Sequence, residues 1–373
     1  MHDNIVKLSN LCDEIISEES LAELLNSKTP INHYIGFEIS GKPHIGTGLM
    51  TMQVIKILQD SGVNCMIWLA DWHAWINDKL GGDKKFITEV GLPYFKANMI
   101  AAAMVCGVDI SKLGFRSGSV EYENLNFWET FIDVSKNVTL ARVQRTISVL
   151  GRKEGESVDF AKLVYPPLQI ADIFYLQAHI AHAGMDQRKA HVVALDCALS
   201  LKQNQLMMNG KAIKPVCVHQ HLLLGLSTPP KEMQEAGELT HEMKAELKMS
   251  KSIPNSAVFM NDSEDEIAKK IKAAYCPEGV VNLNPILDWA KYICFNLGTK
   301  KISIERKEEW GGNVEYLNYK DLESDFVNKK LHPMDLKNGI TKSLVEILTP
   351  ARNYLNTPEI KALEDQITAR VSR

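Results

Sequence analysis

Residues 34–48 read YIGFEISGKPHIGTG, and this stretch decides the fold of the 373-residue chain. The apolar residues of 34–39 predict a strand, and the Ser-Gly-Lys-Pro segment after them predicts a loop before a helix that begins near Gly48. A glycine-containing loop that enters a helix N-terminus is a natural phosphate site, because free N–H groups and the helix dipole point at the anion. His44 lies in this loop, and its ring can donate to phosphate oxygens. We therefore expect a nucleotide site at this loop.

A second polar stretch, LKMSKS at residues 247–252, has the same chemical character. It supplies the ammonium groups of Lys248 and Lys251 together with two hydroxyls. Two phosphate-directed segments so far apart in the sequence suggest one nucleotide that is held from two sides.

The length and composition are those of an ordinary globular protein with about two domains. The net charge of -4 does not exclude a nucleic-acid partner, because basic segments occur locally. Seven scattered cysteines without a CxxC pair indicate reduced, buried thiols of a cytoplasmic protein rather than a disulfide framework or a zinc site. No apolar run approaches about 20 residues, so we expect no membrane span, and the acidic N-terminus is unlike a signal peptide.

The alternation of elements after the opening loop predicts an α/β fold. Residues 49–58 have the pattern of a helix, and residues 63–70 that of a strand buried on both faces of a parallel sheet. This order predicts a doubly wound sheet that binds ligands beyond the carboxyl ends of its strands. The segments 34–40 and 70–73 should therefore meet at one mouth. Further strands are expected at 113–116 and 213–219, and helices at 11–26, 83–106 and 121–150.

After residue 262 the pattern changes to helices, with candidates at 264–275, 285–297, 322–330 and 333–354. Ser263 and Glu266 form a capping-box signature at the start of the first. We place a domain boundary at residues 257–258, and expect the tail at 356–373 to be a short helix or a frayed end.

One helix, predicted over residues 166–184, carries polar residues on a single face. Tyr165, Gln169 and Asp172 recur at spacings of four and three, so they lie on one side of the helix. A buried carboxylate requires hydrogen-bonding partners. The face is therefore either the wall of a pocket for a polar small molecule or a stripe that faces solvent.

The two phosphate-directed segments together resemble the HIGH and KMSKS signatures of class I aminoacyl-tRNA synthetases, although Thr47 stands in place of the second histidine. The runs EIISEESLAELL, YIGFEISGK, LADWHAW, VYPPLQIADIFYL, GMDQRKAH, KAAYCPEGVV and LHPMDLKN extend this resemblance to the tyrosyl-tRNA synthetases of the archaeal and eukaryotic kind. The resemblance implies a Rossmann-type catalytic domain at 1–257 with a dimer-forming insertion, a helical anticodon-binding domain at 258–373, and a homodimer.

The resemblance also assigns the tyrosine pocket. It places the tyrosine hydroxyl between Tyr34 and Asp172, and the amino group near Tyr165, Gln169 and Gln187, with His73 at the edge. A phenol needs a strong acceptor, which Asp172 supplies, whereas phenylalanine would leave that carboxylate desolvated and unpaired.

On the ATP side, the resemblance gives catalytic roles to His44, Lys248 and Lys251. The tyrosine carboxylate is already ionised at pH 7, so its attack on the α-phosphate needs no general base, and the enzyme should act by alignment and charge stabilisation, with Mg²⁺ on the phosphates. The ATP contacts that the resemblance implies are Gly36, His44, Gly46, Thr47, Met249, Ser250 and Lys251.

Contacts with tRNA(Tyr) are implied in two regions. Arg145, Arg188 and Lys189 should face the acceptor end, unless they are only solvated helix charges. Trp310 should stack on an anticodon base and Asp335 should pair with it, as unpaired RNA bases are commonly read. The alternatives are a core tryptophan and a helix-terminal charge.

Trp68 stands at a pocket-facing position where the family usually has a smaller aliphatic residue, and its indole could narrow the pocket. Three other functions therefore remain open: the sister enzyme for tryptophan, a noncatalytic paralogue that binds RNA or a small ligand, and a small-molecule adenylyltransferase. An intact KMSKS segment argues against the second, and a helical second domain has no evident use in the third.

Overall fold

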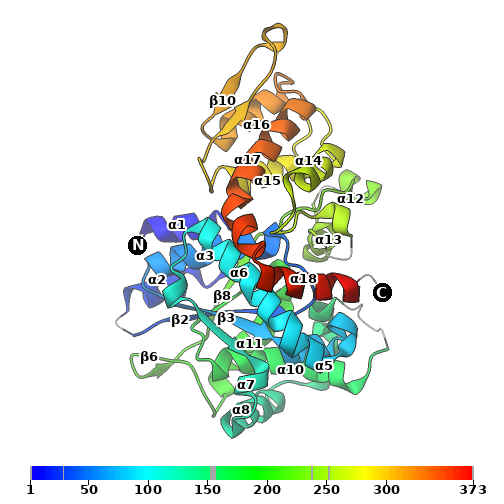
Figure 1. The fold of residues 1–373 in the computed structure, drawn as a ribbon. Coiled ribbons are helices and arrows are strands. Elements are labelled where there is room, and N and C mark those ends of the chain that lie inside the picture. Colours follow the sequence, from blue (N-terminus) through cyan, green and yellow to red (C-terminus); the bar gives the residue numbers. More distant parts are fainter. Residues whose placement is uncertain (1, 28, 152–156, 237, 251–252, 372–373) are drawn as a thin grey trace.

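The computed structural model describes residues 2–27, 29–151, 157–236, 238–250 and 253–371. A six-stranded sheet forms its centre, in the order β1-β8-β5-β2-β3-β4 (Figure 1). The first strand runs antiparallel to its neighbour, and the other neighbouring pairs are parallel. The strands are β1 (Cys12–Ile16), β2 (Asn32–Glu38), β3 (Asn64–Ala70), β4 (Gly114–Ser117), β5 (Ile180–Gly184) and β8 (Val216–Gln220).

The chain order of these strands defines where a ligand can bind. From β2 the chain moves outward on one side to β3 and β4, and then returns to β5 and β8 on the other side. The crevice at the carboxyl ends of β2 and β5 is therefore the switch point, where sheets of this kind bind their ligands. The predicted α/β class with a mostly parallel, doubly wound sheet is confirmed.

Helices surround the sheet and fill the insertion between β4 and β5. The α-helices of residues 2–247 are α1 (His2–Ser9), α2 (Glu18–Asn26), α3 (Ile45–Asp60), α4 (Asp71–Ile76), α5 (Lys84–Phe86), α6 (Leu92–Cys106), α7 (Gly118–Glu121), α8 (Leu125–Lys136), α9 (Leu140–Thr146), α10 (Phe160–Tyr175), α11 (Arg188–Cys197), α12 (Lys231–Glu235) and α13 (His241–Leu247). Short 3-10 or π turns include η1 (Lys79–Gly82), η2 (Ile87–Gly91), η4 (Ile147–Leu150) and η5 (Met185–Gln187). Among the helices described, none combines the length and apolar character that crossing a membrane requires.

The C-terminal part is mainly helical, as expected, with α14 (Glu264–Ala273), α15 (Pro285–Trp289), α16 (Tyr319–Val327), α17 (Pro333–Leu355) and α18 (Pro358–Val371). The Ser263–Glu266 capping box is formed. A small hairpin of β9 (Ile302–Ile304) and β10 (Val314–Tyr316) was not predicted, because strands of three residues give almost no periodic signal. The domain division at residue 257 remains a prediction.

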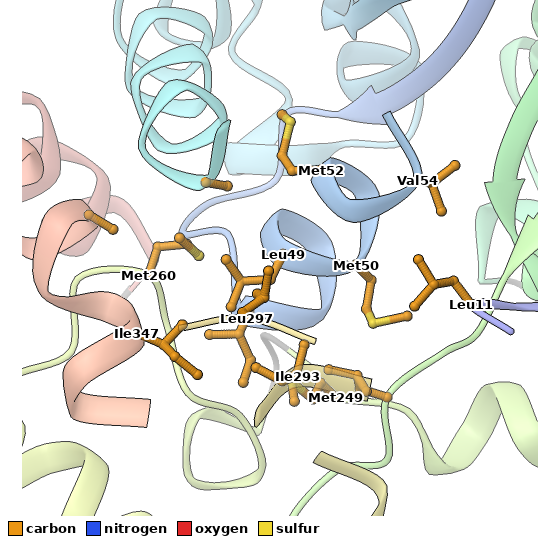
Figure 2. Packing of buried hydrophobic residues seen from close by; sticks show 14 of the residues in the cluster. Leu11, Leu49, Met50, Met52, Val54, Met249, Met260, Ile293, Leu297 and Ile347 are labelled. Carbon is orange, nitrogen blue, oxygen red and sulfur yellow. The ribbon is translucent and has the colours of Figure 1, made fainter. Parts of the chain in front are cut away.

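Apolar side chains of the two parts form one continuous core. Figure 2 shows Leu49 and Met50 of α3 beside Met249 of the KMSKS segment and Ile293 and Leu297 of the C-terminal part. Each of these five side chains is less than one-tenth exposed. The helix that follows the phosphate loop is therefore fixed by packing on several sides, which holds its N-terminus rigidly at the switch point.

Two predictions of secondary structure were wrong. Residues 11–26 do not form one helix, because residues 12–16 pair with β8 as an edge strand. Ser17, with φ 69°, has a left-handed backbone that separates this strand from α2. The helix predicted over 166–184 begins earlier, at Phe160, contains Pro166 in its interior and ends at Tyr175. The following residues, 180–184, form β5 between β2 and β8, since pairing within the sheet outweighs local helical preference.

Candidate active site

A cavity of about 1080 Å³ opens at the switch point of the sheet. Its walls contain most of the predicted site residues: Tyr34, Gly36, His44, Gly46, Thr47, His73, Tyr165, Gln169, Asp172, Gln187, Arg188, Lys189, Lys248, Met249 and Ser250. Arg145, Trp310 and Asp335 do not line it. The predicted catalytic residue Lys251 lies outside the described residues.

Asp172 lines the cavity and is fully buried. The Tyr122 hydroxyl donates to its Oδ1 at 2.8 Å, whereas its Oδ2 has no hydrogen-bond partner among the described groups. Burial raises the pKa of Asp172 well above its ordinary value, and the Tyr122 hydroxyl and the Trp68 indole act in the opposite direction. A buried carboxylate oxygen without a partner is costly, so this site is built to receive a donor from a ligand.

Tyr34 on β2 forms the wall beside this carboxylate, and Trp68 on β3 packs behind it. Both side chains are almost fully buried, and burial together with the nearby charge of Asp172 raises the pKa of the Tyr34 phenol. The Trp68 ring lies 5.7 Å from the ring of Tyr122 and belongs to the core behind the cavity rather than to its lining. The large indole therefore supports the wall and does not fill the pocket. A Cβ at Gly36 would stand 2.7 Å from the Tyr34 hydroxyl, so the absence of a side chain here preserves that wall.

A second polar group lies along the same face of α10. The side-chain amide of Gln187 donates to the carbonyl of Val149 at 3.1 Å, and that of Gln169 donates to Oε1 of Gln187 at 3.2 Å. This chain of bonds orients Gln169 so that its Oε1 is buried, with no partner among the described residues. The one-sided face predicted for α10 is thus a pocket wall, and it offers an acceptor for an ammonium group.

Tyr165 and His73 complete this wall. Their rings meet edge to face, with centroids 4.5 Å apart. Burial lowers the pKa of His73 to about 3, so its ring is neutral at physiological pH. Its Nε2 lies 3.7 Å from Oδ2 of Asp172, beyond hydrogen-bonding distance, and that oxygen stays available to a ligand.

His44 caps α3 and faces the cavity from the phosphate loop. Its Nδ1 accepts from the backbone N–H of Thr47 at 3.1 Å, which assigns the ring proton to Nε2. The Thr47 hydroxyl lies 3.4 Å from that nitrogen. The backbone of Thr47 therefore orients the His44 ring, its hydroxyl lies beside Nε2, and the N–H of His44 stands at a helix N-terminus.

The described part of the KMSKS segment closes the opposite side. Lys248 Nζ lies 2.5 Å from Oδ2 of Asp186. Burial would raise the pKa of Asp186, but the charge and hydrogen bond of Lys248 outweigh it and lower that pKa. The Met249 side chain is buried in the core, so it anchors the segment. Of the residues of this segment that the structure describes, Lys248 brings a charged group to the cavity.

The predicted tRNA-facing residues separate into three locations. Arg188 lines the cavity, but its guanidinium is held by Glu14 through two bonds of 2.8 and 2.9 Å. Lys189 is partly exposed at the cavity rim, and Arg145 is exposed on α9. Arg188 is therefore partly neutralised within the fold, unlike the freely solvated charge that the sequence allowed.

Trp310 and Asp335 lie in the C-terminal part. Trp310 is 61% exposed in the loop between β9 and β10, so it is not a core residue. Asp335 lies in the first turn of α17. Arg306 donates both to the carbonyl of Gly312 in the hairpin loop, at 2.7 Å, and to that of Lys330 before α17, at 2.9 Å. This bridge ties the loop of Trp310 to the segment that leads into the helix of Asp335.

Three residues of the site were not predicted. Tyr122 comes from a segment assigned only as helical, and no spacing connects it with Asp172, which is 50 residues away. Glu38 raises the pKa of Tyr165 after the larger effect of burial, and Asp186 pairs with Lys248. Glu38 is the last residue of β2 and lies in the predicted strand, so its place at the carboxyl end of a strand was an available signal. Asp186 comes after β5, which was predicted as part of a helix, so no such signal pointed to it.

Comparisons with known proteins agree with this arrangement. Residues 26–349 match the family model of the class I tRNA synthetases (W and Y). The tyrosine–tRNA ligase of Pyrococcus abyssi is 51% identical over 342 residues, which are 92% of this chain and 91% of that protein. The tyrosine–tRNA ligase of Thermococcus sibiricus is 50% identical over the same shares.

Solved structures give the same assignment. The tyrosyl-tRNA synthetase of Pyrococcus horikoshii, determined with L-tyrosine, superposes with a TM-score of 0.92 at 47% identity and covers 98% of this chain and 99% of its own. A tryptophanyl-tRNA synthetase of Aeropyrum pernix, at 18% identity and a TM-score of 0.65, shares the fold alone. The chain therefore belongs to the class I tRNA synthetases for tryptophan and tyrosine, within the group of tyrosine–tRNA ligases, which are ATP-dependent enzymes.

Proposed function

We propose that the unpaired Oδ2 of Asp172 is the acceptor that selects tyrosine, and that it carries the specificity of this tyrosine–tRNA ligase. It belongs to a fully buried carboxylate that lines the cavity, and the Tyr122 hydroxyl donates to the other oxygen. A phenol hydroxyl would donate to Oδ2, with Tyr34 beside it. Phenylalanine would bury the carboxylate and leave it without that bond, which is unfavourable.

The amino group of the bound tyrosine would then donate to the buried Oε1 of Gln169, which has no partner among the described residues. Gln187 and Tyr165 stand beside it in the same cavity. With both ends fixed, the tyrosine carboxylate points toward the phosphate loop. This placement converts the attack on ATP into a reaction of aligned groups, which is the main contribution expected of the enzyme.

In the first step, the tyrosine carboxylate attacks the α-phosphorus of ATP, the bond to the β,γ-diphosphate breaks, and tyrosyl-adenylate and pyrophosphate form. The N–H at Nε2 of His44 would donate to the α-phosphate oxygens, with Gly36, Gly46 and Thr47 along the nucleotide. Lys248, with Lys251 from the same segment, would stabilise charge on the departing pyrophosphate. In the second step, a terminal ribose hydroxyl of tRNA(Tyr) attacks the adenylate carbonyl and AMP leaves.

Mg²⁺ is part of this proposal as a companion of ATP. Within the described ranges, no three His, Cys, Asp or Glu side chains are grouped to hold a metal ion. Mg²⁺ is commonly bound through substrate phosphates and only one or two carboxylates, so such a grouping is not needed. The ion would lower the charge repulsion around the phosphates, while the residues named above orient them.

We also propose that Trp310 and Asp335 read the anticodon of tRNA(Tyr), supported by the exposed indole and the Arg306 bridge between their segments. Arg145, Arg188 and Lys189 would contact the acceptor end. For Arg188 this requires exchange of its Glu14 partner or a contact made while that pair persists.

A cytoplasmic homodimer is the proposed form of the enzyme. The insertion between β4 and the middle of α10 exposes five large apolar side chains to at least 55% each, at Val120, Leu125, Ile132, Leu140 and Phe160. A surface rich in exposed apolar groups commonly marks an interface, and the second copy of this chain is the partner we assign to it. Sedimentation of the wild type and of Leu125→Glu tests this, with a dimer expected only for the wild type.

The central assignment is tested by the variant Asp172→Ala in ATP–pyrophosphate exchange with tyrosine and with phenylalanine. The ratio of kcat/KM for the two amino acids should collapse toward one, because the charged acceptor that distinguishes them is gone. Asp196→Ala, which removes an exposed carboxylate on α11, is the matched control and should keep the ratio. Full discrimination retained by Asp172→Ala would refute the pocket assignment.

A further inference from the structure

The last helix of the chain, α18, lies against the catalytic part rather than at the end of the C-terminal part. It packs against α6, η1 and η2, and Figure 1 shows it in red, crossing beside α6. Two side chains of α18, Glu364 and Arg370, reach loops at the rim of the active-site cavity. The helix is therefore placed to influence the reaction.

Glu364 makes the first of these contacts. Its carboxylate is 7% exposed, and its Oε1 accepts from Lys42 Nζ at 2.6 Å while its Oε2 accepts from Lys361 at 2.9 Å. Burial would raise the pKa of Glu364, but the two ammonium groups lower it, so the carboxylate is ionised. Lys42 stands two residues before His44 in the phosphate loop, and removing the Glu364 charge from this partly buried pair leaves the Lys42 ammonium without its carboxylate partner.

Arg370 makes the second contact. Its Nε donates to the carbonyl of Leu80 at 3.1 Å, and its Nη2 pairs with Asp83 at the same distance. Leu80 has a left-handed backbone, with φ 51°, and follows Lys79, which lines the cavity and pairs with Glu38 at 3.4 Å. One helix thus holds two separate rim loops.

The phosphate loop is held on its other side by the segment after KMSKS. The backbone N–H of Ile45 donates to Val258 at 2.9 Å, and that of Met260 donates to Pro43 at 3.2 Å. Between β2 and α3 the loop has no regular structure of its own. These backbone bonds and the pair formed by Lys42 and Glu364 are among the contacts that hold its conformation.

We propose that Glu364 is a positioning residue for the ATP half of the reaction: through Lys42 it fixes the loop that presents His44 to the α-phosphate. Lys42 does not line the cavity, so the effect passes through the loop rather than through direct contact with ATP. The inference rests on the proposed use of His44. It gives the C-terminal helix α18 a role in the reaction of the catalytic part, through the position of the phosphate loop. A loop displaced by a fraction of an ångström would align ATP less well while leaving the tyrosine pocket, on α10, unchanged.

Glu364→Gln in the full-length chain tests this, because it keeps the size of the side chain and removes its charge. In ATP–pyrophosphate exchange, we expect KM for ATP to rise at least about fivefold or kcat to fall by a similar factor, with KM for tyrosine within about twofold of the wild type. Asp365→Asn on the same helix, whose side chain is 70% exposed, should change neither constant. The wild-type exchange rate tests the proposed function separately, so the two failures are distinguishable.

A double-mutant cycle with Lys42→Met decides whether the pair is the cause. The double variant should be no worse than the poorer single variant, because both remove one interaction. Additive losses, an equal rise of KM for ATP and tyrosine, or a lowered unfolding temperature with unchanged kinetics would each overturn the proposal and leave α18 a purely structural helix.

Discussion

Replacing Tyr122 by phenylalanine isolates the hydrogen bond that orients the selecting carboxylate. The hydroxyl donates to Oδ1 of Asp172 at 2.8 Å, whereas Oδ2 has no hydrogen-bond partner among the described groups. Removing the Tyr122 hydroxyl therefore takes away the hydrogen bond that Oδ1 receives from it. The ring should stay in place, because it stacks on Phe127 with centroids 3.9 Å apart and the Tyr122 carbonyl accepts from Trp128 Nε1 at 2.8 Å. The variant is thus a change of one bond rather than of packing.

The size of the effect follows from the charge of the acceptor. A hydrogen bond to a charged group contributes about 1.5–3 kcal/mol, which corresponds to about 10- to 150-fold in an equilibrium constant. Burial already raises the pKa of Asp172, and the Tyr122 hydroxyl is the main group that opposes this rise. Without it the carboxyl becomes harder to ionise, so KM for tyrosine should increase by about one to two orders of magnitude.

The pH dependence gives this prediction a sign. Because the pKa of Asp172 rises further in Tyr122→Phe, the deficit should be larger at low pH than at high pH, where more of the carboxyl is ionised. The assay is ATP–pyrophosphate exchange at several pH values, with KM for ATP as an internal reference. Tyr175→Phe is the matched control, since its hydroxyl pairs with Glu121 at 3.0 Å outside the cavity. An unchanged KM for tyrosine at every pH would refute the reasoning.

Three further predictions follow from other parts of the molecule. Lys248→Met should lower kcat of exchange by about 100-fold and leave tyrosine binding, measured by calorimetry, unchanged; impaired tyrosine binding would contradict this role. Trp310→Ala should reduce charging of tRNA(Tyr) by about 10-fold with normal exchange, as loss of one stacking contact predicts; loss of exchange would mean that the indole supports the fold. Burial lowers the pKa of His221, but Asp288 and Asp13 raise it to about 10, above the ordinary 6.5. The protonated ring therefore stabilises the folded state in full below pH 6.5, and this stabilisation is lost as pH rises from 6.5 toward 10. The free energy of unfolding of the wild type relative to His221→Gln should therefore fall by at most about 1.4 kcal/mol per pH unit across this window, and a flat difference in urea denaturation would contradict it.

Much of the fold was predictable because strong local patterns coincide with burial. The strand β3 is apolar after its first residue, β2 has an apolar centre, and α3 is rich in apolar residues, and the side chains of these stretches are mostly buried. The edge strand β1 was not predicted, because its local sequence pattern is weak. Its two isoleucines suit a strand or a helix, and only the neighbouring β8, 200 residues away, decides between them.

The site divides in the same way. Residues of α10 were found together because one helix face places Tyr165, Gln169 and Asp172 side by side. Tyr122 was not found, because its hydroxyl reaches Asp172 only through the packing of α8 and the loop before it against α10. The role of Trp68 likewise depended on depth: a pocket-facing strand position was expected, but the indole lies behind the cavity wall.

The most direct test of the central claim is amino-acid-dependent ATP–pyrophosphate exchange by the wild-type chain, without tRNA, across the twenty standard amino acids. The account predicts exchange with tyrosine and almost none with phenylalanine or tryptophan, because only the phenol satisfies Asp172 within this pocket. Exchange with tryptophan in place of tyrosine would show that the chain is specific for tryptophan. No exchange from folded protein that still binds tRNA(Tyr) would contradict the proposed chemistry altogether.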